Sequence, residues 1–101
     1  MNGLLNKVDI IKNMNNLSNH WRLEDIYLKA NFDFKSFSDA ITFMSIVGKK
    51  CDKLNHHPKW TNVYNKIEIE LYTHDAGGIT VKDFELSSFM DEVYSLSLIH
   101  I

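Results

Sequence analysis

The sequence has little of what marks secreted, membrane-spanning or metal-rich proteins. Its 101 residues include one proline, four glycines and one cysteine, Cys51, so no disulfide can form within the chain and no Cys-x-x-Cys pair exists for zinc or redox chemistry. No apolar run approaches the ~18–20 residues that span a bilayer. The first residues lack the apolar stretch of a secretory signal. We therefore expect a soluble protein of the cytoplasm, with the nucleus as an alternative, and no membrane contact.

An excess of charge of either sign is also missing. Eleven lysines and arginines face thirteen acidic residues, for a net charge of −2, and the basic residues are scattered. Since binding to a phosphate backbone needs a basic surface, we expect no direct contact with nucleic acid. The length predicts a single domain over residues 1–101. A domain of this size buries only roughly 60–70% of its unfolded surface, which favours association of subunits.

The apolar residues follow two periods along the chain. Helical spacing marks three segments, and alternation of apolar and polar residues marks two β segments between them. Ser-x-x-Asp at Ser36 and Thr-x-x-Asp at Thr80 resemble capping boxes that begin the second and third helices. The predicted segments are a helix over 4–17, a hairpin over 21–34, a helix over 37–54, a β segment from Val63, a loop over 74–78 and a helix from Thr80. The order α-β-β-α-β-β-α predicts an α+β fold, with a four-stranded antiparallel sheet and helices on one face.

Histidines fall at the breaks between these elements. His56 and His57 follow the long helix, and His74 ends the second β segment. Imidazole gives and takes protons near neutral pH, and Asp52, four residues before His56, is placed to orient that ring. Asp75 stands beside His74. Two alternatives remain open: the pairs cap a helix end or lie on the surface, or the three histidines bind a metal.

The aromatic residues near the histidines also allow two interpretations. Trp60 and Tyr64 could stack on a flat heterocycle, or they pack in the core or at a subunit interface. Gly77 and Gly78 indicate a turn. Cys51 is expected in the core, as are the phenylalanines of the middle region: Phe32, Phe34, Phe37 and Phe43.

Together these residues resemble the pterin-4a-carbinolamine dehydratase family. The family's signature runs from a charged residue through His-His-Pro, an aromatic residue and a further histidine to an aspartate. In this chain the matching positions, at matching intervals, are Asp52, His56-His57-Pro58, Tyr64, His74 and Asp83. The surrounding stretch NHHPKWTNVYNKIEIELYTHDAGGIT is similar almost throughout, and the resemblance extends over about residues 17–95.

The resemblance implies dehydration of 4a-hydroxytetrahydrobiopterin to quinonoid dihydrobiopterin, in tetrahydrobiopterin recycling, without a metal or a redox cofactor. It assigns His56 and His74 as the acid/base pair and His57 as a third active-site histidine that binds and orients the pterin. Asp52 would orient His56, and Asp83 completes the motif as a cap. The implied substrate contacts are Asn55, His56, His57, Tyr72, Thr73, His74 and Asp75, with Asp52, Pro58, Trp60, Tyr64 and Asp83 in support.

The family resemblance also implies partners. Its members form homodimers or homotetramers, and some act as dimerisation partners of a homeodomain transcription factor, so a protein-interaction module is the alternative function. Two positions depart from the family pattern: Asn55 stands where many relatives carry an acid, and Tyr72 where some carry Ser or Thr. The C-terminal SLSLIHI is compatible with helix, strand or an interface element.

Overall fold

Helices and strands alternate along the chain in the predicted order. The structure is a computed structural model that describes residues 3–99. Its elements are α1 (Lys7–Met14), β1 (Trp21–Glu24), β2 (Tyr27–Asp33), α2 (Phe37–Leu54), β3 (Lys59–Val63), β4 (Lys66–Leu71), the short 3₁₀ helix η1 (His74–Ala76) and α3 (Val81–Ile99). The predicted α+β class and element order are therefore confirmed. Within residues 3–99, no helix is both long and apolar enough to cross a membrane.

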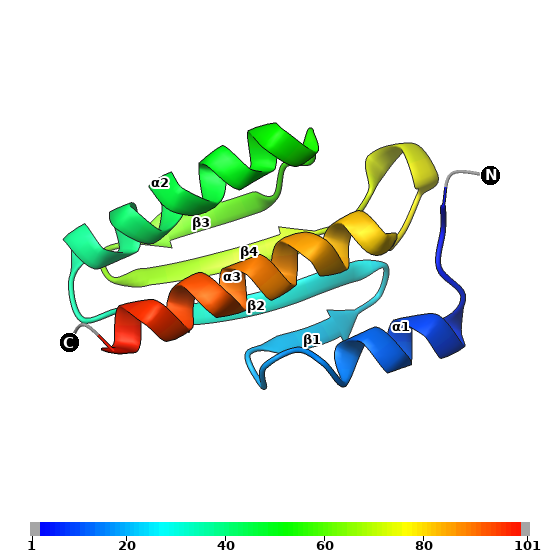
Figure 1. Cartoon of the computed structure of the whole chain (residues 1–101), viewed down its shortest axis with the longest axis horizontal. Helices are drawn as coiled ribbons and strands as arrows, with labels where there is room; N and C mark the ends of the chain where they lie inside the picture. Colours follow the sequence, from blue (N-terminus) through cyan, green and yellow to red (C-terminus); the bar gives the residue numbers. More distant parts are fainter. Residues whose placement is uncertain (1–2, 100–101) are drawn as a thin grey trace.

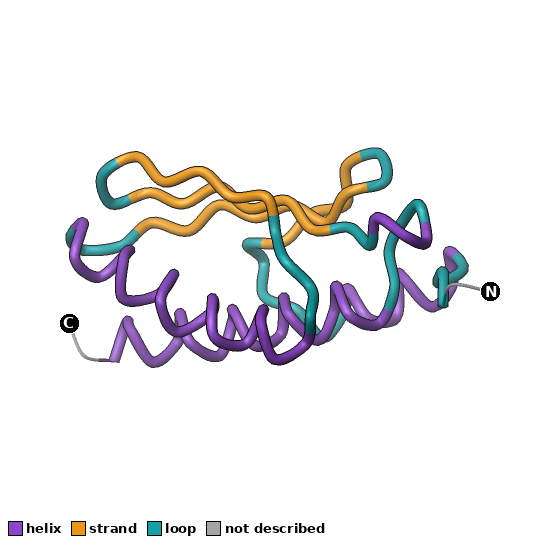
Figure 2. Tube along the Cα trace, turned by 90° about the horizontal axis from the view of Figure 1, so that it is seen from above, coloured by secondary structure: helices purple, strands orange, loops and turns teal. Residues whose placement is uncertain are grey.

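The four strands form one antiparallel sheet in the order β1-β2-β4-β3 (Figure 1). In the described part of the chain, α1, α2 and α3 lie on the same face of this sheet and leave the other face bare (Figure 2). The two central strands bury every second side chain towards the helices: Leu28, Ala30 and Phe32 of β2, and Ile67, Ile69 and Leu71 of β4. The intervening side chains point to the bare face, as the alternation predicted.

Capping side chains fix where the long helices begin. The backbone N–H of Asp39 donates to Oγ of Ser36 at 3.1 Å. At the start of α3, the N–H of Thr80 donates to Oδ2 of Asp83 at 2.9 Å, and the N–H of Lys82 donates to Oγ1 of Thr80 at 3.3 Å. Both predicted capping boxes therefore lie at the helix starts, and α2 has the predicted bounds.

Two predictions on either side of α2 are wrong. β3 begins at Lys59, directly after the proline, and not at Val63. Residues 59–63 already alternate between the two faces and pair with β4: Trp60 and Asn62 face the helices, and Lys59 and Thr61 face the bare side. Phe37, expected in the core, is 48% exposed at the first turn of α2, before the helix packs on the sheet.

The first helix is shorter than predicted, and the apolar stripe expected for it, Leu4, Val8, Ile11 and either Met14 or Leu17, packs on the core only at its C-terminal end. Leu4, Val8 and Ile11 are more than half exposed. The residues that pack against the core are Leu5, Ile10, Met14 and Leu17. The C-terminal SLSLIHI continues α3 as far as Ile99, and its last two residues lie outside the described part of the chain.

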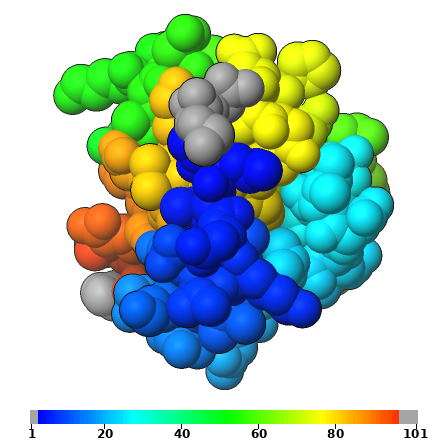
Figure 3. Space-filling model, turned by 90° about the vertical axis from the view of Figure 1, so that its right-hand side faces the viewer, coloured from blue at the N-terminus to red at the C-terminus, as the bar shows by residue number. Residues whose placement is uncertain are grey.

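One end of the molecule gathers the segments that carry the predicted site. The C-terminal end of α2, the loop around η1 and the β1–β2 turn all lie there, at the right of Figure 1. The N-terminal segment crosses this end beside the η1 loop (Figure 3), where the N–H of Leu5 donates to the carbonyl of Ile79 at 2.9 Å. Gly78 leaves room for this contact, because a Cβ there would lie 2.7 Å from the end of the Leu4 side chain, which would have to shift.

Candidate active site

A tight turn between α2 and β3 sets the positions of the two adjacent histidines. Asn55 follows the helix with φ 51° and ψ 46°, the left-handed conformation that asparagine tolerates better than most residues. The N–H of Asn55 donates to the carbonyl of Asp52, and the N–H of His56 to that of Cys51. This pair of bonds is the Schellman arrangement, which ends the helix and turns the chain sharply. His56 and His57 consequently enter different environments.

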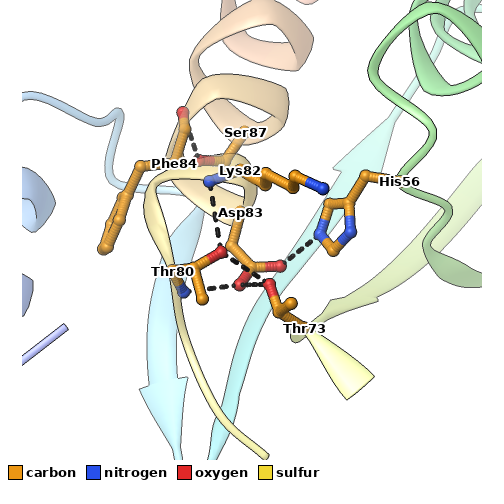
Figure 4. Close-up of polar contacts among 7 residues, drawn as sticks. All are labelled: His56, Thr73, Thr80, Lys82, Asp83, Phe84 and Ser87. Atoms are coloured by element: carbon orange, nitrogen blue, oxygen red, sulfur yellow. Dashed lines mark hydrogen bonds and ion pairs between the residues drawn. The ribbon is translucent and has the colours of Figure 1, made fainter. Parts of the chain in front are cut away.

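His56 lies inside the protein, bonded to a buried carboxylate. Its side chain is 8% exposed, and its Nε2 lies 2.6 Å from Oδ1 of Asp83, which is fully buried (Figure 4). Asp83 stands in the first turn of α3, where the helix dipole favours negative charge. Since a buried charge is tolerated only when it is paired and hydrogen-bonded, this contact holds the imidazole firmly.

Two threonines complete the environment of Asp83. The hydroxyl of Thr73 donates to Oδ2 at 2.8 Å, and the N–H of Thr80 donates to the same oxygen at 2.9 Å. Because the Thr73 hydrogen is used on the carboxylate, the Thr80 hydroxyl donates to Oγ1 of Thr73, 2.7 Å away. The N–H of Lys82 donates to Thr80 in turn, so the donors form a chain that ends on the carboxylate (Figure 4).

This network selects one tautomer of His56. An ionised carboxylate can only accept, so the proton of a neutral His56 lies on Nε2 and its lone pair lies on Nδ1. Within the described part of the chain, no hydrogen bond occupies Nδ1, and no buried side-chain nitrogen or oxygen lacks a partner. Nδ1 therefore reaches solvent, as a proton acceptor whose orientation Asp83 fixes.

His57 has a different carboxylate partner. Its Nε2 lies 2.9 Å from Oδ1 of Asp52, and both side chains are exposed. The expectation that Asp52 orients His56 is therefore wrong. A spacing of four residues brings side chains together only while the helix continues, and α2 ends at Leu54, before either histidine.

A cleft of about 320 Å³ opens beside these residues, at the edge of the bare sheet face. β2 and β4 pair Leu28 with Leu71, so Tyr27 and Tyr72 follow as neighbours, with ring centroids 5.2 Å apart. β3 and β4 pair Lys59 with Glu70 at the opposite side. The cleft is lined by Tyr27, His57, Pro58, Lys59, Glu70, Tyr72 and His74. Its volume lies at the lower end of the range for small-molecule sites, and aromatic rings supply much of its wall.

A tight loop places His74 on this cleft. The N–H of Thr73 donates to the carbonyl of Gly78 at 2.7 Å, and the N–H of Gly77 returns to the carbonyl of Thr73 at 3.0 Å. Gly77 has φ 73°, which glycine adopts without strain. Within the loop, Nδ1 of His74 lies 2.8 Å from the hydroxyl of Tyr72. Thr73 lies between them in sequence and bonds to Asp83, so it connects the His74 loop with the His56 network.

The structure brings together most of the predicted site residues. His57, Pro58, Tyr72 and His74 line the cleft, and His56, Thr73 and Asp83 form the adjoining network. Asn55 and Asp75 are exposed at the same end of the molecule.

Two predicted residues lie elsewhere. Trp60 packs against the core under α2, which agrees with the core interpretation. Tyr64 is 66% exposed in the β3–β4 turn, five residues and roughly 16 Å of strand away from Lys59.

Three residues that line the cleft were not predicted: Tyr27, Lys59 and Glu70. The alternation of β4 contained a signal for one of them, because it places Glu70 on the same face as Tyr72. Tyr27 comes from a distant part of the sequence and is brought in by strand pairing. Among residues 3–99, no three histidine, cysteine or acidic side chains converge in a way that could hold a metal ion. The three-histidine arrangement considered as a metal site is thus not formed.

Comparisons with known proteins agree with this architecture. Residues 4–93 match the family model of pterin 4 alpha carbinolamine dehydratase. A curated protein of Synechococcus sp. (strain WH7803), named "Putative pterin-4-alpha-carbinolamine dehydratase", is 44% identical over 78 residues, which cover 77% of this chain and 84% of that protein. A protein of Rhizobium meliloti (strain 1021) with the same name is 52% identical over 61 residues, covering 60% of this chain and 59% of that protein.

Solved structures show the same fold. The chain superposes on a transcriptional coactivator/pterin dehydratase from Brucella melitensis with a TM-score of 0.86 and 30% identity, covering 90% of this chain and 98% of the other. A pterin dehydratase-like protein described as a RuBisCO assembly factor shares the fold alone, with a TM-score of 0.63 and 16% identity over 75% of this chain and 90% of the other. On the family match and the relatives together, the chain belongs to the pterin 4 alpha carbinolamine dehydratase family.

Proposed function

We propose that the chain is a hydro-lyase that converts 4a-hydroxytetrahydrobiopterin to quinonoid dihydrobiopterin and water. The observation that carries this proposal is the pair of oriented imidazoles at one end of the sheet: His56 held by Asp83, and His74 held on an aromatic-walled cleft. Membership of the family supports the choice of substrate. The same membership supports a place in tetrahydrobiopterin recycling in the cytoplasm.

The reaction needs one proton acceptor and one proton donor. A base removes the proton from a ring nitrogen of the substrate, and the electron pair of that N–H bond forms a C=N bond to C4a. The C4a–O bond breaks with its electron pair on oxygen, and an acid protonates that oxygen so that it leaves as water. Positioned groups of this kind contribute roughly 10²–10⁴-fold each. Neither step is an oxidation or a reduction, so the reaction as a whole needs no redox cofactor.

We assign the two roles to His56 and His74 as an acid/base pair. The partner of His56 is a carboxylate, which stabilises the charged ring that forms when Nδ1 accepts a proton. His57, paired with Asp52 at the rim, binds and orients the pterin. The rings of Tyr27 and Tyr72 offer a flat apolar wall to a planar bicyclic ligand, and Lys59 and Glu70 offer polar partners to its edge. Asn55 and Asp75, which are exposed and close in sequence to the lining residues His57 and His74, are assigned as further contacts with substrate, whereas Thr73 acts through Asp83.

The direct test follows the decay of 4a-hydroxytetrahydrobiopterin with and without the protein. We expect faster decay with the wild type and at least about tenfold lower kcat for His74→Ala. Tyr64→Phe serves as the control, since Tyr64 lies at the far end of β3, and its kcat should equal that of the wild type. Equal decay with and without the wild-type protein would refute the function, and an unchanged kcat in His74→Ala would remove His74 from the mechanism.

We also propose that the chain self-associates as a homodimer or homotetramer. The edge strand β3 leaves one side unpaired within the described sheet, and Phe37, Ile41 and Ile46 of α2 are each more than a third exposed. Light scattering of the purified protein would test this, and a monomeric mass at micromolar concentration would contradict it.

The second candidate function is a protein-interaction module with a transcription-factor partner. It is favoured by the name of the 30% identical Brucella protein, a transcriptional coactivator/pterin dehydratase. A stable complex in a pull-down, together with an inactive enzyme assay, would favour this function over the dehydratase.

A further inference from the structure

Tyr72 lines the cleft, and its hydroxyl meets the imidazole of His74. Oη of Tyr72 and Nδ1 of His74 are 2.8 Å apart. Resting on the proposed dehydratase function, we propose that Tyr72 is a positioning residue: it fixes the neutral His74 ring with its proton on Nε2, and so makes His74 the proton donor of the pair.

The geometry supports a fixed partnership. Tyr72 follows directly after β4, and its ring packs edge-on against Tyr27 at 5.2 Å, which limits where the hydroxyl can point. The His74 backbone is held by the bonds between Thr73 and the glycine turn. Within the described part of the chain, the Tyr72 hydroxyl makes one hydrogen bond, and its partner is His74.

The direction of this bond follows from the chemistry of the two groups. A phenol hydroxyl is a good donor, and the imine nitrogen of a neutral imidazole is a good acceptor. When Tyr72 donates to Nδ1, the proton of His74 lies on Nε2. His56 has the opposite arrangement, because its partner Asp83 accepts from Nε2 and leaves a lone pair on Nδ1. One histidine therefore presents an acceptor and the other presents a donor, and the partner of each ring decides which.

This assignment accounts for every proton in the dehydration. The proton from the substrate ring nitrogen goes to Nδ1 of His56. Nε2 of His74 gives its proton to the departing hydroxyl, which leaves as water with the electron pair of the C4a–O bond, and the hydroxyl proton of Tyr72 moves to Nδ1 of His74. The Tyr72 oxygen then takes its proton back from Nδ1 of His74. The proton held by His56 returns through solvent to Nε2 of His74, which regains its starting tautomer.

Nitrogen-15 NMR of the histidine rings tests the tautomer without relying on activity. We expect the wild-type His74 signal, assigned by its loss in His74→Gln, to show a protonated Nε2 and an unprotonated Nδ1 above the pH at which the ring loses its charge. Tyr72→Phe keeps the ring and its contact with Tyr27 but removes the hydroxyl, so His74 should become a mixture of tautomers. Tyr27→Phe is the matched control and should leave the His74 signal unchanged.

Kinetics then test the consequence. In Tyr72→Phe we expect kcat to fall about tenfold with little change in KM, because the hydroxyl acts through His74 and not on substrate binding. A proton on Nδ1 in the wild type, or an unchanged tautomer in Tyr72→Phe, would overturn the inference even if the enzyme is active. An inactive wild type with the expected tautomer would instead refute the proposed function and leave the positioning role in place.

Discussion

Replacement of Asp83 by asparagine tests the core of the candidate site with almost no change in shape. The side-chain oxygen of the introduced asparagine can still accept from Thr73 and from the N–H of Thr80, so the cap of α3 is retained. Its amide group, however, faces Nε2 of His56 in place of Oδ1. Since an amide NH₂ can only donate, Nε2 must lose its proton, and the proton of His56 moves to Nδ1. The ring is then unable to accept a proton at the atom that reaches solvent.

The structure sets the size of the expected effects. Hydrogen bonds to charged groups contribute about 1.5–3 kcal/mol each and neutral ones about 0.5–1.5, so Asp83→Asn, which keeps three bonds but makes them neutral, should lower the free energy of unfolding by about 1–3 kcal/mol. Asp83→Ala leaves all three donors unpaired in the interior and should cost about 3–5 kcal/mol. Loss of a positioned base should reduce kcat by roughly 10²–10⁴-fold in the asparagine variant.

The assay combines urea unfolding with kinetics of 4a-hydroxytetrahydrobiopterin decay. Ser36→Ala provides the control for stability alone, since it removes the N-cap of α2, away from the site, and should cost about 1 kcal/mol without a change in kcat. A folded Asp83→Asn protein with kcat within about twofold of the wild type would refute His56 as the base. If Asp83→Asn and Asp83→Ala lower the free energy of unfolding equally, the asparagine side chain does not keep the hydrogen bonds to Thr73 and Thr80, and this reasoning is refuted.

Three further predictions concern stability. Burial raises the pKa of the Cys51 thiol from 9.0 to about 11, so the stability contributed by the neutral thiol is complete below about pH 9 and is lost as the pH rises towards about 11. In urea titrations across this range, the free energy of unfolding should fall more steeply with pH for the wild type than for Cys51→Ala. Parallel declines would contradict the burial. Asp91→Ala removes the acceptor of the Trp21 indole N–H and should cost about 1–3 kcal/mol in urea unfolding, whereas no loss would show that water replaces the carboxylate. Asn55→Ala should cost about 1 kcal/mol because of its left-handed backbone, with Asn55→Gly near neutral; a greater loss in the glycine variant would contradict this cause.

Local patterns predicted those parts of the fold that depend on neighbours in the sequence. The bounds of α2 follow from Ser36 at its start and from the proline after its end, and the Thr80–Asp83 pair starts α3 as expected. α1 was predicted as a helix, but Leu4, Val8 and Ile11 of its expected stripe are exposed, because both sides of this helix carry apolar residues. Which side is buried depends on where the helix lies against the sheet, and helical spacing does not contain that information.

In the candidate site, too, the sequence predicted which residues take part, and the tertiary structure decided which of them are in contact. The spacing of motif residues identified Asp52, Asp83 and the histidines, but it paired Asp52 with the wrong imidazole. Twenty-seven residues separate His56 from Asp83. Their contact forms because the end of α2 and the start of α3 meet at one end of the sheet, a consequence of strand order and not of local sequence.

Periodicity, caps and motif spacing are properties of the chain read in order, so the residues alone were sufficient to predict the α+β class, the order of the elements and the family. The partner of each imidazole, in contrast, depends on how distant segments meet. Burial beside α3 gives His56 a carboxylate, and the pairing of β2 with β4 places Tyr27 beside Tyr72 on the cleft that His74 lines. Proton acceptors and donors are set by contacts across the fold, since the hydrogen bond on one nitrogen of a histidine ring determines what the other nitrogen can do.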